Sequence, residues 1–168
     1  MSKKKIFRGI GTALITPLRD GVIDYTALNN IIDVQIEAGV DAIIIGGTTA
    51  EAATLTDGER YQLFAYAKAA IASRCKLIFG TGTNDTRLAV EHTKRASKIG
   101  CDGVLCVTPY YNKATQRGLI ESFTAIADAS TKPCILYNVP SRTGINIEPA
   151  TYAVLAEHPM IQGIKEAN

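Results

Sequence analysis

Lys165 is the residue whose placement most directly suggests chemistry, because it closes the apolar run Ile161–Lys165. A short apolar run that ends in lysine is typical of a buried parallel strand that delivers one amine to the rim of a sheet. Partial desolvation at such a rim favours the neutral amine, which is the nucleophile that imine formation with a carbonyl substrate requires. A lone lysine there is more often an ordinary solvated side chain that follows an edge strand, so its neighbours in the fold must distinguish the two interpretations.

A loop of glycines and hydroxyls, Gly46–Glu51, follows the second apolar run of the chain. Its glycines let backbone N–H groups approach a bound anion closely, and its threonine hydroxyls can donate to a carboxylate or pass a proton. Gly47, Thr48 and Thr49 are therefore candidate ligands for an anionic substrate.

Two further loops carry phenols beside turn residues, Thr108–Asn112 and Tyr137–Gly144. The second also carries Arg142, whose guanidinium fork can bind a planar carboxylate through two hydrogen bonds. Taken singly, a tyrosine at a strand end is more often an interfacial core residue, and a lone arginine a surface charge. Together with the lysine they predict a site for a carbonyl substrate that carries a carboxylate.

The elements that must position these residues alternate along the chain. Six short β-type runs begin about 30 residues apart, the length of one strand-plus-helix unit. They are Thr12–Ile15, Asp41–Ile45, Leu77–Phe79, Gly103–Val107, Cys134–Asn138 and Ile161–Lys165. Helical segments are predicted between them at Tyr25–Ala38, Asp57–Ala72, Thr86–Ile99, Gln116–Ala129 and Glu148–Glu157. Thr56 and Glu59 have the spacing of a capping box at the start of the second helix.

This alternation predicts an α/β fold with a parallel sheet, either doubly wound or a (β/α)₈ TIM-barrel type. A dinucleotide-binding sheet requires GxGxxG after its first strand, whereas Gly80–Gly82 follows the third run and Gly9–Gly11 precedes the first. The polar loops all follow strand ends, where a barrel builds its active site. A closed barrel needs eight units and about 250 residues. We therefore expect residues 1–168 to form the N-terminal part of a single barrel, truncated after about the sixth strand.

Composition excludes several functional classes. The 18 basic and 16 acidic residues give a net charge of +2, which favours neither nucleic acid nor a membrane surface as a partner. No apolar stretch approaches the roughly 20 residues that span a bilayer. The four cysteines form no CxxC pair, and the two histidines lie at no zinc-ligand spacing from them. Reduced core cysteines in a cytoplasmic protein are the resulting prediction.

Five motifs of the chain together resemble the 4-hydroxy-tetrahydrodipicolinate synthase (dihydrodipicolinate synthase) family. In order, they are GGTTAEAATL, GTGTN, TPYYN, YNVPSRTG and GIKEA. The resemblance extends from about Ile6 to Asn168. This family belongs to the pyruvate-dependent class I aldolases, which also include N-acetylneuraminate lyase. The lysine strand and the YNxP turn mark the superfamily, whereas the paired tyrosines and Arg142 in SRTG point to the synthase.

The resemblance implies a lyase of lysine and diaminopimelate biosynthesis that condenses pyruvate with aspartate semialdehyde. Lys165 would form the Schiff base, and Tyr137, Thr48 and Tyr111 would relay protons. Gly47, Thr48 and Thr49 would hold the pyruvate carboxylate, and Arg142 would pair with the semialdehyde carboxylate. No metal or organic cofactor would be needed, since the imine is the electron sink. A homodimer or homotetramer is implied, with Tyr111 completing a neighbouring subunit's site.

The chain departs from the family at a few positions. Ala50 stands where glycine is usual and Ala114 where proline is common. Leu88 and Arg60 replace a glutamate and a histidine of lysine-regulated relatives, which implies weak or absent lysine inhibition.

Two alternatives remain open at this stage. One is N-acetylneuraminate lyase or another 2-oxo acid aldolase. The other, of a different class, is an inactive fragment or assembly piece, because a chain of this length is expected to be inactive or nearly so on its own.

Overall fold

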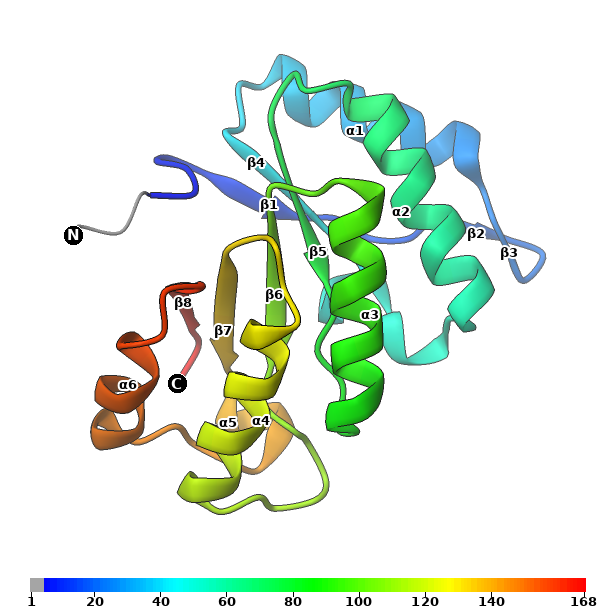
Figure 1. The fold of residues 1–168 in the computed structure, drawn as a ribbon. Helices are drawn as coiled ribbons and strands as arrows, with labels where there is room; N and C mark the ends of the chain where they lie inside the picture. Colours follow the sequence, from blue (N-terminus) through cyan, green and yellow to red (C-terminus); the bar gives the residue numbers. More distant parts are fainter. Residues whose placement is uncertain (1–4) are drawn as a thin grey trace.

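One parallel sheet forms the centre of the molecule in the computed structural model, which describes residues 5–168. Among these residues the strand order is β1-β4-β5-β6-β7-β8, which follows the chain without a reversal (Figure 1). The strands are β1 (Gly11–Ala13), β4 (Ala42–Ile45), β5 (Lys76–Gly80), β6 (Gly103–Val107), β7 (Cys134–Asn138) and β8 (Ile161–Glu166). A doubly wound sheet reverses its strand order at a switch point, so this order excludes that alternative.

Of the described helices, the five longest lie on the outer face of the curved sheet (Figure 1). They are α1 (Tyr25–Glu37), α2 (Asp57–Ile71), α3 (Thr86–Ile99), α4 (Gln116–Asp128) and α6 (Pro149–Ala156). Each packs against the next along the chain. Right-handed crossovers between successive parallel strands place every helix on the same face, which leaves the other face concave and free of helices.

Local sequence signals explain where the helices begin and end. The side chains of Asp24, Thr56, Asp85 and Thr115 cap the first turns of α1 to α4. Thr56 and Glu59 form the predicted capping box, with Glu59 Oε2 accepting from the Thr56 amide at 2.8 Å. Gly100 ends α3 in the left-handed conformation at φ +101°, which a side chain would disfavour.

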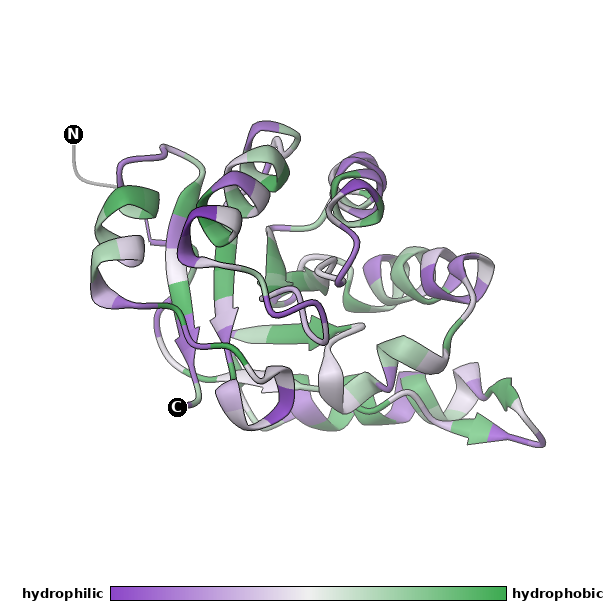
Figure 2. Cartoon of the chain, turned by 90° about the horizontal axis from the view of Figure 1, so that it is seen from below, coloured by the Kyte–Doolittle hydropathy of each residue, from purple (hydrophilic) through white to green (hydrophobic). Residues whose placement is uncertain are grey.

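The central strands β4 to β7 are buried on both faces. Alternate residues point to opposite sides, so Phe79 and Cys106 face the helices whereas Ile78 and Leu105 face the concave side. The larger core lies between sheet and helices and includes the stacked rings of Phe64 and Phe79, 4.1 Å apart. Figure 2 shows the resulting pattern of largely hydrophobic strands and helices with mixed faces.

The predicted strands and helices are confirmed, with ends that shift by a residue or two. Four shorter features were not predicted: the hairpin of β2 (Leu18–Arg19) and β3 (Val22–Ile23), the 3₁₀ turns η1 (Thr48–Ala50) and η2 (Ala52–Thr54), and the short helix α5 (Pro140–Thr143). The hairpin turns at Asp20 and Gly21, whose φ angles of +51° and +81° suit an Asp-Gly turn. Its strands are too short to produce an alternating pattern in the sequence.

The four cysteines are free thiols. Cys101, Cys106 and Cys134 are buried, and burial raises the pKa of the Cys101 thiol to about 11. Within residues 5–168, no helix has the length and apolar character needed to cross a membrane. The same residues contain no cluster of three potential metal ligands.

Candidate active site at the carboxyl ends of the strands

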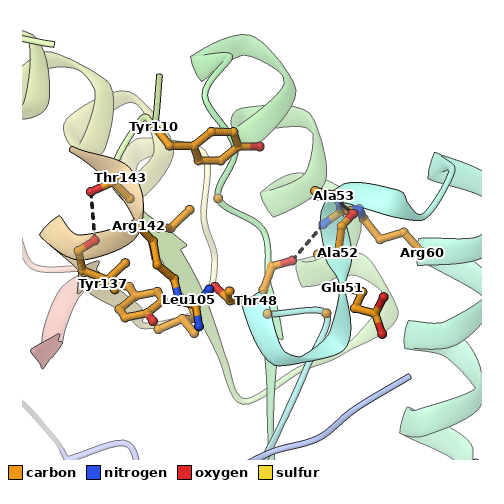
Figure 3. Close-up of a pocket in the computed structure, with 16 residues that line it drawn as sticks. Thr48, Glu51, Ala52, Ala53, Arg60, Leu105, Tyr110, Tyr137, Arg142 and Thr143 are labelled. Atoms are coloured by element: carbon orange, nitrogen blue, oxygen red, sulfur yellow. Dashed lines mark hydrogen bonds between the residues drawn. The ribbon is translucent and has the colours of Figure 1, made fainter. Parts of the chain in front are cut away.

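A cavity of about 270 Å³ opens where β4, β5, β6 and β7 end. Loops that follow all four strands contribute to its lining (Figure 3). The structure brings together four of the predicted site residues in this cavity: Gly47, Thr48, Tyr137 and Arg142. It also confirms that the polar loops meet at one end of the sheet.

Glycines make the floor of the cavity possible. Gly46 has φ +70°, and a side chain there would meet the Phe64 ring. A methyl on Gly80 would collide with the Gly46 carbonyl, and one on Gly82 with the backbone at Val107. The ends of three neighbouring strands thus approach more closely than side chains would permit, and the loop after β4 lies over the sheet.

The loop after β4 turns at once into η1. The Ala50 amide donates to the Gly47 carbonyl at 3.1 Å, and the Ala50 carbonyl accepts from the Thr16 hydroxyl at 2.9 Å. Ala50 is buried, so the methyl that replaces the family's usual glycine packs inside the loop. Thr48 lines the cavity, whereas Thr49 is exposed and does not.

The register between β7 and β8 sets Lys165 directly beside Tyr137. The Lys165 Nζ atom lies 4.2 Å from the centre of the Tyr137 ring, within the range of a cation–π contact. Tyr137 is buried and lines the cavity, while Lys165 is half-buried. Lys165 itself lines an adjoining hollow of about 420 Å³ on the concave face, which shares Leu105 with the cavity. The amine therefore lies at the boundary between the two spaces.

Arg142 lies on α5, a four-residue helix that begins at Pro140 and ends at Gly144 in the left-handed conformation. The Thr143 hydroxyl anchors this turn by donating to the Val139 carbonyl at 3.1 Å. Figure 3 shows the Arg142 side chain extending beside Tyr137 toward Thr48. Arg142 forms no ion pair with any residue in the described part of the chain, so its guanidinium is available to an anionic ligand.

Tyr111 is not brought to this cavity. Its side chain is 87% exposed and its backbone is in the left-handed region at φ +71°. Its neighbour Tyr110 lines the cavity instead, and Asn112 ties the loop to the Asn84 carbonyl at 2.7 Å. A relay through Tyr111 is thus not assembled within one chain, and its contribution to a neighbouring subunit stays a prediction.

Arg60 is a cavity residue whose burial the sequence reasoning missed. It is only 7% exposed, and its guanidinium donates to the Ala52 carbonyl at 2.8 Å and the Gly80 carbonyl at 3.3 Å. Its Nε has no hydrogen-bond partner among the described residues. Desolvation lowers the pKa of this guanidinium. The available signal was helical periodicity, since Arg60 shares the buried stripe of α2 with Phe64, Ala67 and Ile71.

The fold and site define an α/β protein whose curled parallel sheet carries its candidate site at the carboxyl ends of the strands. The sequence model of the dihydrodipicolinate synthetase family matches residues 6–168. The chain belongs to this family.

Individual members of the family are similar to the chain in sequence and in structure. The chain is 49% identical over 162 residues to the 4-hydroxy-tetrahydrodipicolinate synthase of Alkaliphilus oremlandii, covering 96% of this chain and 56% of the relative. It is also similar to the crystal structure of dihydrodipicolinate synthase from Thermotoga maritima, with a TM-score of 0.95 and 41% identity over 98% of this chain and 56% of that one. The enzyme of Acinetobacter baumannii, solved in complex with pyruvate, gives a TM-score of 0.94 and 45% identity over 98% and 56% of the two chains. The chain therefore spans about half the length of these relatives.

Proposed function

We propose that the protein is a lyase that condenses pyruvate with aspartate semialdehyde to give 4-hydroxy-tetrahydrodipicolinate, in lysine and diaminopimelate biosynthesis. Family membership and the names of its relatives support the reaction. A relative of known structure also binds pyruvate. The observation that carries the proposal is the Lys165 amine, 4.2 Å above the Tyr137 ring at the edge of a cavity that holds Thr48 and Arg142.

The chemistry starts at Lys165. Its neutral amine attacks the ketone carbon of pyruvate, and loss of water gives the imine. Removal of a methyl proton gives an enamine, whose carbon forms the new bond with the aldehyde carbon of the second substrate. The amino group of that substrate then attacks the imine carbon, which closes the ring and frees Lys165. The imine is the electron sink, so the proposal includes no metal or organic cofactor.

Other residues bind and transfer protons. Tyr137 lies nearest to the amine and is proposed to give and take protons around the imine, with Thr48 next in the relay. Backbone N–H groups at Gly47, Thr48 and Thr49 are proposed to hold the pyruvate carboxylate. Arg142 is proposed to bind the semialdehyde carboxylate, because a guanidinium fork matches a planar carboxylate in shape and charge.

At the level of the whole protein, we propose that residues 1–168 contribute six strands and the five long helices between them to a (β/α)₈ barrel. Within the described residues, β1 pairs only with β4, and β8 only with β7, so one edge of each remains for further strands. A parallel sheet is normally covered on both faces, and this one has helices on one face only. A cytoplasmic homodimer or homotetramer, in which Tyr111 enters a neighbouring site, completes the proposal.

An aldehyde panel tests the substrate assignment. The intact protein is incubated with pyruvate and, separately, aspartate semialdehyde, N-acetylmannosamine and acetaldehyde, and carbon–carbon bond formation is followed by mass spectrometry. We expect condensation with aspartate semialdehyde to be the fastest. Preferred condensation with N-acetylmannosamine would instead identify a sialic acid lyase.

A further inference from the structure

The carboxyl ends of β7 and β8 are held together by a side-chain network that faces away from the proposed site. Asn138 pairs with Glu166 in the same register that pairs Tyr137 with Lys165. Because successive side chains of a strand point to opposite faces, the first pair lies on the helix side and the second on the concave side. A shift of Asn138 relative to Glu166 therefore also shifts Tyr137 relative to Lys165.

The network consists of three side chains from three elements. Asn138 Nδ2 donates to Glu166 Oε1 at 2.8 Å, and the Tyr152 hydroxyl of α6 donates to Glu166 Oε2 at 2.9 Å. The Asn138 side chain also contacts Asn146 Oδ1 at 2.6 Å and accepts from the Ile147 amide at 3.1 Å. Asn138 is 1% exposed, so its amide is fixed by these partners rather than by water.

The protonation states of Glu166 and Tyr152 allow Glu166 to accept these hydrogen bonds and Tyr152 to donate one. Desolvation raises the pKa of Glu166, but hydrogen bonds from Tyr152, Asn138 and the backbone amides of Ala167 and Asn168 together outweigh it and leave the pKa below its ordinary value. Desolvation and the neighbouring carboxylate raise the pKa of Tyr152. Glu166 is thus an ionised acceptor at neutral pH, and Tyr152 keeps the proton that it donates.

The β7–β8 register requires an interaction that fixes it near Lys165. The β7–β8 pairing shifts between Cys134 and Ile135, where β8 has one extra residue. A slip of one residue turns every later side chain to the opposite face, which would move Lys165 away from Tyr137. The Asn138–Glu166 bond follows the shift and lies one residue beyond the Tyr137–Lys165 pair.

We propose that Asn138, Glu166 and Tyr152 are positioning residues that hold the Lys165 amine over Tyr137 and so set the rate at which the imine forms. This inference rests on the proposed function, because it assigns Lys165 the Schiff-base role. None of the three residues lines the cavity or the adjoining hollow. They act on the reaction through the β7–β8 register, and the Ala167 amide, which donates to the Asn138 carbonyl at 3.0 Å, reports on that register.

The test uses two conservative variants with matched controls. Glu166→Gln keeps the shape but leaves one oxygen to serve two donors, and Tyr152→Phe removes one donor. Tyr66→Phe, which loses a comparable hydroxyl bond to the Tyr25 carbonyl, and Glu121→Gln on the exposed face of α4 are the controls. The rate of the borohydride-trapped pyruvate adduct on Lys165 is measured at saturating pyruvate in the intact protein, together with the thermal midpoint and hydrogen exchange at Ala167.

We expect Glu166→Gln to slow adduct formation by about ten- to a hundredfold, the usual effect of misplacing a reacting group by about an ångström. Tyr152→Phe should slow it less, and exchange at Ala167 should quicken in both, while the controls keep the rate of the unmodified protein. Asn138→Asp places two carboxylates against each other, and adding Glu166→Gln restores a donor and should recover part of the rate.

Three results would overturn the inference. In the first, Glu166→Gln and Tyr152→Phe form the adduct at the rate of the unmodified protein. In the second, they slow adduct formation no more than a control variant whose thermal midpoint falls by the same amount. In the third, the double variant forms the adduct no faster than Asn138→Asp alone. A protein without substitutions that forms no adduct on Lys165 would refute the proposed function itself, and the positioning role with it.

Discussion

Tyr137 and Lys165 meet because a parallel register puts them side by side, and the proposed reaction gives the two residues different tasks. In that proposal the amine supplies the covalent bond, and the buried phenol beneath it exchanges protons with the imine. Replacing Tyr137 by phenylalanine keeps the ring under the amine and removes only the hydroxyl. We expect kcat to fall by about 10²–10⁴-fold while pyruvate binding is largely kept. Steady-state kinetics with a pyruvate-binding measurement tests this, and an unchanged kcat would remove Tyr137 from the proton relay.

Arg142 should affect a different kinetic constant. Its guanidinium is exposed at the cavity and is not engaged in an ion pair within residues 5–168. Arg142→Ala should raise the KM for aspartate semialdehyde by about ten- to a hundredfold, since a hydrogen bond to a charged group contributes about 1.5–3 kcal/mol. The KM for pyruvate serves as the internal control. Unchanged semialdehyde kinetics would remove the main residue that separates the synthase from a sialic acid lyase.

At the scale of elements, α2 and α3 are joined by a buried histidine that should make stability depend on pH. The Tyr61 hydroxyl lies 2.6 Å from His92 Nδ1, and Asp57, Glu91, Arg60 and Arg95 are the charged groups nearest to this ring. Desolvation lowers the pKa of His92 from 6.5, so the unfolded chain binds the proton more strongly than the folded one. The stability that neutral His92 contributes is therefore complete above pH 6.5 and is lost as the pH falls toward the lowered value.

Urea unfolding on either side of this pH tests the effect. The free energy of unfolding should fall more steeply between about pH 7 and about pH 5.5 in the unmodified protein than in His92→Gln, because only the former gains a proton at this position on unfolding. His158→Gln, outside the α2–α3 contact, should keep the acid-dependent loss. Equal slopes in the unmodified protein and His92→Gln would contradict the assignment.

How far the elements could be predicted depends on the range of the interactions that form them. The apolar runs and the capping box at Thr56 are local signals, so strands and helices emerged within a residue or two of their observed ends. The convergence of Thr48, Tyr137 and Arg142 also follows from local order, since parallel strands present their carboxyl ends at one edge. The helical periodicity of α2 places Arg60 on the buried stripe, but the carbonyls that accept its hydrogen bonds belong to two other segments, which no local pattern specifies.

At the scale of the whole molecule, the described sheet has two edges and a concave face that bears apolar residues and Lys165. The relatives are nearly twice as long as the matched region, since that region covers 56% of their length. We expect the 168-residue chain alone to show little or no condensing activity, because closure of a barrel needs eight strands. Adding a polypeptide that corresponds to the remaining length of a relative should restore turnover, measured as condensation of the two substrates. Full activity of a homogeneous preparation of the 168-residue chain would contradict this expectation.

Covalent trapping shows whether Lys165 is the residue that forms the Schiff base. The intact protein is treated with pyruvate and borohydride, digested, and mapped by peptide mass spectrometry, with Lys165→Arg as the control variant. We expect one stable pyruvate-derived adduct, located on Lys165 and absent from Lys165→Arg. An adduct on a different lysine, with Lys165 unmodified in a preparation that condenses pyruvate, would contradict it.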